Sequence, residues 1–81
     1  MPSMGIESSR AHLISVNPLQ PGGFLISFDL AGKKLYYVLN ITSRRTAAAF
    51  RITPLGPRGD GPYTGREGKL DLILRSGRLE K

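Results

Sequence analysis

FLISFDLAGKKLYYVLNI, residues 24–41, contains the two strand-forming runs around which the rest of the chain is organised. Two runs rich in aromatic and β-branched residues flank a short break at Ala31-Gly32. Strand-forming runs separated by a brief glycine-containing turn are the sequence signature of a β-hairpin. We therefore predict that residues 24–41 form the hairpin on which a small antiparallel sheet is built.

The hairpin has two chemically reasonable registers, and the hydrophobic pattern favours one of them. If Ala31-Gly32 is the loop, Phe28 lies opposite Leu35 and the large apolar side chains gather on one face. A three-residue loop over 30–32 would avoid a positive φ at alanine, but it would mix the two faces. We expect the two-residue loop. The apolar face then consists of Phe24, Ile26, Phe28, Leu30, Leu35, Tyr37, Leu39 and Ile41. The opposite face consists of Leu25, Ser27, Asp29, Lys34, Tyr36, Val38 and Asn40.

The length and composition indicate one small domain. The 81 residues allow a single thin hydrophobic core, so we treat residues 1–81 as one unit. The chain has no cysteine, which excludes a disulfide framework and a zinc–thiolate site. We see no secretory signal and no apolar run near the ~20 residues that span a membrane. We expect a cytoplasmic protein that does not bind membranes.

Short strands are predicted on both sides of the hairpin. Residues 1–10 lack periodicity and are expected to be frayed. Residues 12–16 resemble a first strand, and the prolines and glycines of 17–23 form a loop. Residues 46–53 are ambiguous because their alanine run favours a helix while their phenylalanine, isoleucine and threonine suit a strand. We expect a strand there, since so short a helix with a narrow apolar stripe would be marginal.

The last third of the chain begins with a long irregular segment. Residues 54–69 hold five glycines and three prolines, which predicts a functional or disordered loop. Residues 70–75 alternate in hydrophobicity and are predicted to form a strand, and 78–81 a charged tail or a brief last strand. The inward residues of the 70–75 strand would be Leu70, Leu72 and Leu74. The expected fold is all-β, or β-rich α+β: a small antiparallel sheet or partly open barrel of four to five short strands.

The sequence gives little support for catalysis. The single histidine, His12, lies in an apolar run, and the three aspartates have no paired spacing. No spacing of metal ligands is present, and the glycines of 56–68 match no phosphate-binding pattern. Arg58-Gly59-Asp60 spells an integrin-binding tripeptide, which we interpret as a chance occurrence in a glycine-rich loop. We expect no enzymatic activity, no cofactor and no bound metal.

The charge of the chain points to an acidic partner. The net charge is +6, and residues 41–81 carry nine basic groups against four acidic ones. A domain with a pI above ~9 is typical of proteins that bind polyanions, most often nucleic acid. Tyr36 and Tyr63 are the aromatic side chains that could stack on bases. The candidate nucleic-acid-binding residues are Lys33, Lys34, Tyr36, Arg44, Arg45, Arg58, Arg66, Lys69 and Arg75.

The second face of the hairpin is also partly apolar. Leu25, Tyr36 and Val38 lie on it, and the chain is too short to cover both sides of its sheet. An exposed apolar patch usually marks an association surface, so we predict that this face binds a second copy of the chain or a protein partner. The leading hypothesis is a small non-catalytic protein that binds, or is associated with, nucleic acid. The alternative is a protein-interaction module or small inhibitor that recognises an acidic protein surface through the hairpin and the 54–69 loop.

Overall fold

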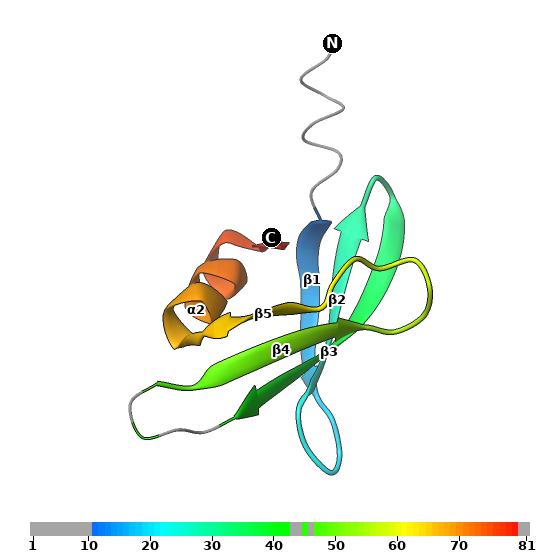
Figure 1. Ribbon diagram of the computed structural model, residues 1–81. Coiled ribbons are helices and arrows are strands. Elements are labelled where there is room, and N and C mark those ends of the chain that lie inside the picture. Colours follow the sequence, from blue (N-terminus) through cyan, green and yellow to red (C-terminus); the bar gives the residue numbers. More distant parts are fainter. Residues whose placement is uncertain (1–10, 43–44, 46, 80–81) are drawn as a thin grey trace.

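The computed structural model describes residues 11–42, 45 and 47–79. Figure 1 shows the strands wrapped around a common interior, with one helix to the side. The elements in chain order are β1 (Ala11–Pro18), β2 (Phe24–Leu30), β3 (Lys33–Thr42), β4 (Ala49–Pro54), β5 (Tyr63–Arg66), α2 (Glu67–Ser76) and β6 (Arg78–Leu79). The 1–10 segment, which we expected to be frayed, and Arg44 lie outside the described residues.

The strands form one sheet in the order β5-β4-β3-β2-β1-β6, and each neighbouring pair is antiparallel. The first five strands follow one another as a meander, and β6 then pairs with β1, so the sheet curls into a nearly closed barrel. Helix α2 connects the two edge strands, β5 and β6 (Figure 1). The all-β prediction is confirmed, with one strand more than expected. The strand predicted over 12–16 is confirmed as β1, and the strand predicted over 46–53 is confirmed from Ala49 onward as β4, while residue 46 lies outside the described residues.

The central hairpin adopts the expected register. Phe28 pairs with Leu35, and every other residue of β2 has the predicted partner on β3. Ala31 and Gly32 form the two-residue loop with φ values of 52° and 82°. Two successive positive φ angles are the geometry of a type I′ turn, whose twist matches that of the flanking strands. The apolar pattern thus overrides the poor fit of alanine to this conformation, which costs about 1–2 kcal/mol.

The inner face of the sheet forms the hydrophobic core. The largest fully buried side chains are Ile26, Phe28, Tyr37, Leu39 and Ile52. The Phe28 and Tyr37 rings meet edge to face with centroids 5.6 Å apart, a favoured aromatic geometry. Ile41 departs from the expected pattern and is 44% exposed. It lies beyond Leu39, the last residue of β3 to pair with β2, so no β2 side chain covers it.

The prediction of a strand over residues 70–75 is wrong, because this segment belongs to helix α2. Leucines at 70, 72 and 74 alternate as in a strand, but Leu70, Ile73 and Leu74 also fit the spacing of a helix face. The helix buries Leu70 and Ile73 against the core and leaves Leu72 62% exposed. Leu72 therefore does not point inward.

Local interactions support the helix over the strand. The Arg75 guanidinium donates a hydrogen bond to the Asp71 carboxylate at 2.6 Å, one helical turn away. Gly77 is left-handed, with φ 73°, and its N–H donates to the Ile73 carbonyl at 2.8 Å. This arrangement is a common helix C-cap. The helix ends at Ser76, and Gly77 caps it.

The prediction of an irregular segment over 54–69 holds only for its first half. Residues 63–66 form β5, which pairs with β4 through Ile52↔Tyr63 and the positions that follow. Tyr63 is buried, and its ring meets that of Tyr37 with centroids 6.4 Å apart. A ring this buried has no free face on which a base can stack, so the prediction that Tyr63 stacks on bases is wrong.

Candidate functional site

The loop between β4 and β5 folds back over the end of the core. A Cβ at Gly59 would lie 2.6 Å from the Pro54 Cβ and 3.0 Å from the Tyr37 hydroxyl oxygen. Real Cβ atoms do not approach other atoms so closely, so this contact requires glycine at position 59. The middle residue of Arg58-Gly59-Asp60 thus has a packing role. Its close approach fixes the position of the loop relative to β3.

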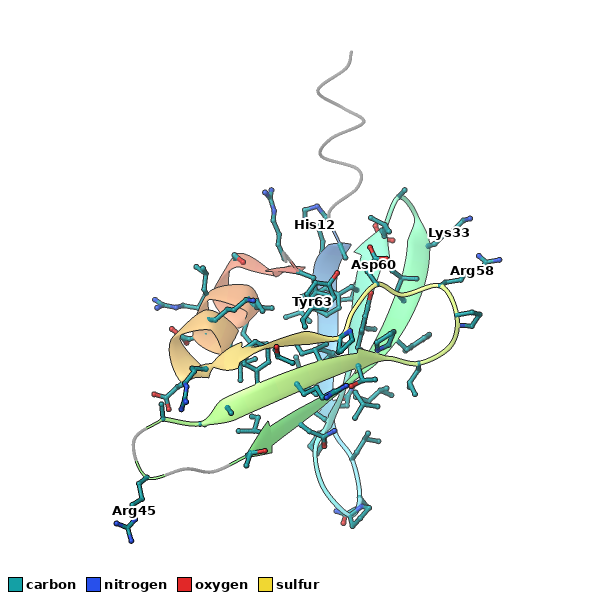
Figure 2. All side chains as sticks on the ribbon, viewed as in Figure 1. His12, Lys33, Arg45, Arg58, Asp60 and Tyr63 are labelled. Carbon is teal, nitrogen blue, oxygen red and sulfur yellow. The ribbon has the colours of Figure 1, made fainter. Side chains whose placement is uncertain are left out.

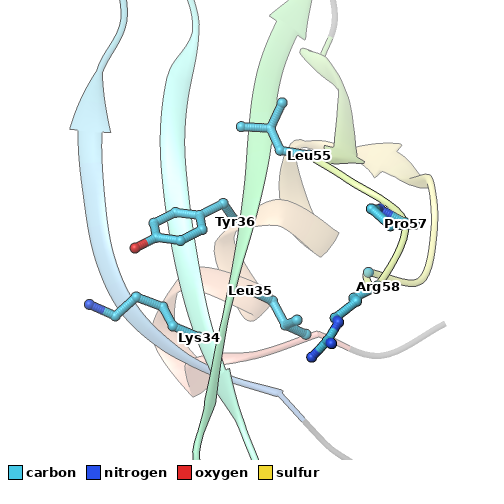
Figure 3. A pocket seen from close by; sticks show the side chains of 7 residues that line it. Lys34, Leu35, Tyr36, Leu55, Pro57 and Arg58 are labelled. Carbon is cyan, nitrogen blue, oxygen red and sulfur yellow. The ribbon is translucent and has the colours of Figure 1, made fainter.

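This loop and the edge of β3 enclose a small groove, which we call the β3–loop groove. Its volume is about 190 Å³. Figure 3 shows Leu35 on the same side of β3 as Leu55, Pro57 and Arg58, while Tyr36 points to the other side. The residues that line the groove are Lys34, Leu35, Tyr36, Leu55, Pro57, Arg58 and Gly59. Arg58 is the cation on the Leu35 side of the groove, whereas the Lys34 side chain points with Tyr36 to the other side of β3 (Figure 3), and no carboxylate is among the described residues that line the groove.

The aromatic side chains beneath the loop experience a low-dielectric environment. Burial raises the pKa of Tyr37 above its ordinary value, and the negative charge of Asp60 acts in the same direction. A backbone hydrogen bond with Asp60 opposes these two effects. Burial also raises the pKa of Tyr63, with the Tyr37 and Asp60 charges as further causes. Both phenols are thus held neutral where the loop meets the core.

These shifts predict that the fold weakens at alkaline pH. A tyrosine in the unfolded chain ionises near pH 10, whereas folded Tyr37 retains its proton to higher pH. Between these two pKa values the unfolded state binds fewer protons than the folded state. The contribution of Tyr37 to the free energy of unfolding is therefore complete below about pH 10 and is lost as pH rises through the folded pKa. Urea unfolding at a series of pH values from 8 to 11 should show this decline, and Tyr37→Phe should reduce its slope. An unchanged slope in Tyr37→Phe would contradict the assignment.

The predicted basic residues do not gather in one place. Figure 2 places Lys33 and Arg58 at one end of the molecule and Arg45 at the far end. Lys34, next to Lys33, shares the groove with Arg58. Arg66, Lys69 and Arg75 lie at the end of β5 and on α2. The Lys69 ammonium donates a hydrogen bond to the Thr64 carbonyl at 3.2 Å, and Arg75 is paired with Asp71.

The outer face of the hairpin carries the three residues predicted as an association surface. Leu25 pairs with Val38 across the strands, and both are half-buried. Tyr36 is 45% exposed. Beside them Ser27 is buried, and its hydroxyl lies 2.6 Å from that of Ser15 in a hydrogen bond across β1 and β2. Self-association through Leu25, Tyr36 and Val38 stays a prediction.

Sequence reasoning missed the groove as a site. It singled out Lys34, Tyr36 and Arg58 for their charge or aromatic character, but not as neighbours. Leu55, Pro57 and Gly59 were read only as parts of a long loop. The available signal was the high density of glycine and proline in 54–62, which indicates a loop with a specific backbone path. It does not indicate which strand that loop approaches.

Other kinds of site have less support. His12 is an exposed residue of β1, and within residues 11–42, 45 and 47–79 no three histidine or acidic side chains gather as metal ligands would. None of the helices among these residues has the length and apolar character needed to cross a bilayer. Comparison of the chain with protein-family models, curated proteins and solved structures gave no match.

Proposed function

We propose that this protein is a small non-catalytic binding domain that holds a segment of a partner protein in the β3–loop groove. The observation that carries the proposal is the composition of that groove. Leu35 of β3 and Leu55 and Pro57 of the loop line it, Arg58 adds positive charge on the same side of β3, and Lys34 adds positive charge on the other side of the strand. An apolar hollow with a few convergent polar groups is the usual form of a binding site.

The distribution of charge favours a protein partner over a long polyanion. A duplex or single strand is held by cations that follow its backbone. In this protein Arg45 lies at the opposite end from Lys33 and Arg58, and Arg75 is paired with an aspartate (Figure 2). The cations of the groove instead flank an apolar surface, an arrangement that suits a segment with both apolar and acidic side chains.

Selection of a random peptide library on the immobilised protein tests the proposal. We expect enriched peptides to contain apolar residues together with Asp or Glu. Arg58→Ala and Lys34→Ala should each weaken the most enriched peptide by about three- to tenfold, between the value of an exposed ion pair and that of a charge-assisted hydrogen bond. Arg45→Ala is the matched control, because it removes the same charge far from the groove.

Two results would contradict the proposal. One is a selection that enriches no peptide above the bare support. The other is equal weakening by Arg45→Ala and Arg58→Ala in fluorescence titrations, which would mean that the peptide responds to net charge and not to the groove.

Nucleic-acid binding is the second candidate, and one observation favours it. The Tyr36 ring is 45% exposed on the sheet face that also carries Lys34. Stacking of a base on such a ring is worth about 1–3 kcal/mol. A titration with a single-stranded oligonucleotide at low salt, run beside the peptide, separates the candidates. Nucleic-acid binding requires a clear loss with Tyr36→Ala and a steep decrease in affinity with added salt.

A further inference from the structure

The edge of β3 that faces the groove is open along part of its length. β3 has ten residues, Lys33–Thr42, but β4 pairs only with Tyr37 and the residues after it. Within the part of the chain that the structure describes, residues 33–36 therefore have a strand neighbour on one side only, which is β2. An edge of this kind presents unpaired backbone N–H and C=O groups that another strand can pair with.

The hydrogen bonds identify which backbone groups are available. The Leu55 N–H donates to the Tyr36 carbonyl at 2.8 Å, so Tyr36 faces the β4 side of the strand. Backbone groups of alternate residues face the same neighbour in an antiparallel sheet, so the N–H and C=O of Lys34 face that side as well. Among the described residues, this bond from Leu55 is the one backbone bond from the loop to this edge. The Lys34 N–H, the Lys34 C=O and the Tyr36 N–H thus border the groove.

The path of the loop keeps these groups free. Residues 55–59 form bends and a turn instead of continuing β4, and Pro57 has no N–H with which to continue the ladder. Gly59 is held against Pro54 and Tyr37, which places the loop along the outer wall of the groove. The space where β4 would have continued is therefore the groove itself.

We propose that the groove binds an extended acidic segment of a partner protein as an added antiparallel strand along Lys34–Tyr36. This inference rests on the proposed function and specifies its mode. The incoming backbone would pair with Lys34 and Tyr36, and its inward side chains would contact Leu35 and Leu55. A carboxylate on the side of the segment that faces Leu35 would lie near Arg58, and one on its other side would lie near Lys34. Strand addition of this kind derives its affinity from main-chain bonds and its specificity from alternate side chains.

Charge decides between this occupant and a second copy of the chain. Two copies that paired antiparallel about Leu35 would place Lys34 of each copy diagonally across from Lys34 of the other, and like charges so close together on one face are destabilising. Asp29, opposite Lys34 on β2, offsets part of that charge, whereas Lys33 lies opposite Leu30. An acidic strand is favoured by the same charges.

The experiment combines a change in the protein with a change in the probe. Lys34→Pro removes the Lys34 N–H and leaves the β2 bonds intact, because those belong to Leu35 and Tyr37. It should weaken the most enriched library peptide by at least about tenfold beyond Lys34→Ala, which loses the charge but keeps the N–H. The same peptide, synthesised with one N-methyl group at each position in turn, should lose binding to the unaltered protein at every second position.

Hydrogen exchange gives a direct readout that does not depend on either variant. In the free protein the Lys34 and Tyr36 amides should exchange faster than that of Leu35, and saturation with the peptide should slow both. Binding that is sensitive to Arg58→Ala but leaves these amides unprotected and tolerates every N-methyl group would overturn strand addition while leaving the proposed function intact. Failure to enrich any peptide would overturn both. A dimer in sedimentation that protects the same amides without peptide would assign the edge to a second copy and also overturn the proposal.

Discussion

Phe28→Ala is expected to lower the free energy of unfolding by about 3–5 kcal/mol, the usual cost of deleting a buried phenylalanine. The Phe28 ring is fully buried at the centre of the sheet, where it packs edge to face against Tyr37. The loss combines the transfer energy of the ring with the cavity that remains, because the surrounding strands relax only partly. Urea denaturation followed by far-ultraviolet circular dichroism measures it.

The matched control is Tyr36→Ala on the other face of the same hairpin. Its ring is 45% exposed, so its removal should cost less than about 1 kcal/mol. A small domain has a total stability of only about 5–15 kcal/mol, so Phe28→Ala could unfold the chain outright. Phe28→Leu then keeps the comparison measurable, with an expected loss of about 1–1.5 kcal/mol. Equal losses in Phe28→Leu and Tyr36→Ala would contradict the observed division of the hairpin into two faces.

The hairpin was predictable because its alternating hydrophobic pattern extends through both strands, and together the two patterns determine the register in which they pair. A shift of one residue between β2 and β3 would move every side chain of one strand to the other face. The long alternation between Phe24 and Leu39 therefore leaves one register that buries the apolar residues together. Exposed Ile41 marks the limit of this reasoning, since alternation alone does not reveal where the neighbouring strand begins.

The β3–loop groove could not be predicted, because it depends on the path of an irregular segment. The high glycine and proline content of 54–62 identified the loop correctly. The position of the loop, however, depends on the close approach of Gly59 to Pro54 and Tyr37, and the sequence does not reveal these contacts. The positions of the cations were partly predictable. The order of strands along the chain places Arg45 at the other end of the molecule from Lys33, whereas the position of Arg58 beside β3 depends on the loop.

Helix α2 was missed because its sequence satisfies two periodicities over a short span. Leu70, Leu72 and Leu74 fit a strand, whereas Leu70, Ile73 and Leu74 fit a helix. Six residues are too few to separate these patterns. The Asp71–Arg75 pair and the glycine after Ser76 were the signals that favoured the helix.

The variants Ile73→Ala and Leu72→Ala test whether this segment is a helix or a strand. In the helix Ile73 is 4% exposed and packs in the core, so its truncation should cost about 2–5 kcal/mol. Leu72, its neighbour, is 62% exposed, and leucine and alanine have nearly equal helix propensity, so Leu72→Ala should change stability by less than about 0.5 kcal/mol.

A strand with Leu70, Leu72 and Leu74 inward predicts the reverse order, because Ile73 would then face solvent. Urea denaturation measures the loss of unfolding free energy in each variant. The helix predicts the larger loss in Ile73→Ala and the strand predicts it in Leu72→Ala, whatever the absolute stability of the domain. A larger loss in Leu72→Ala would contradict the helix. It would also mean that the segment between β5 and β6 does not pack on the core through Leu70 and Ile73, as helix α2 does.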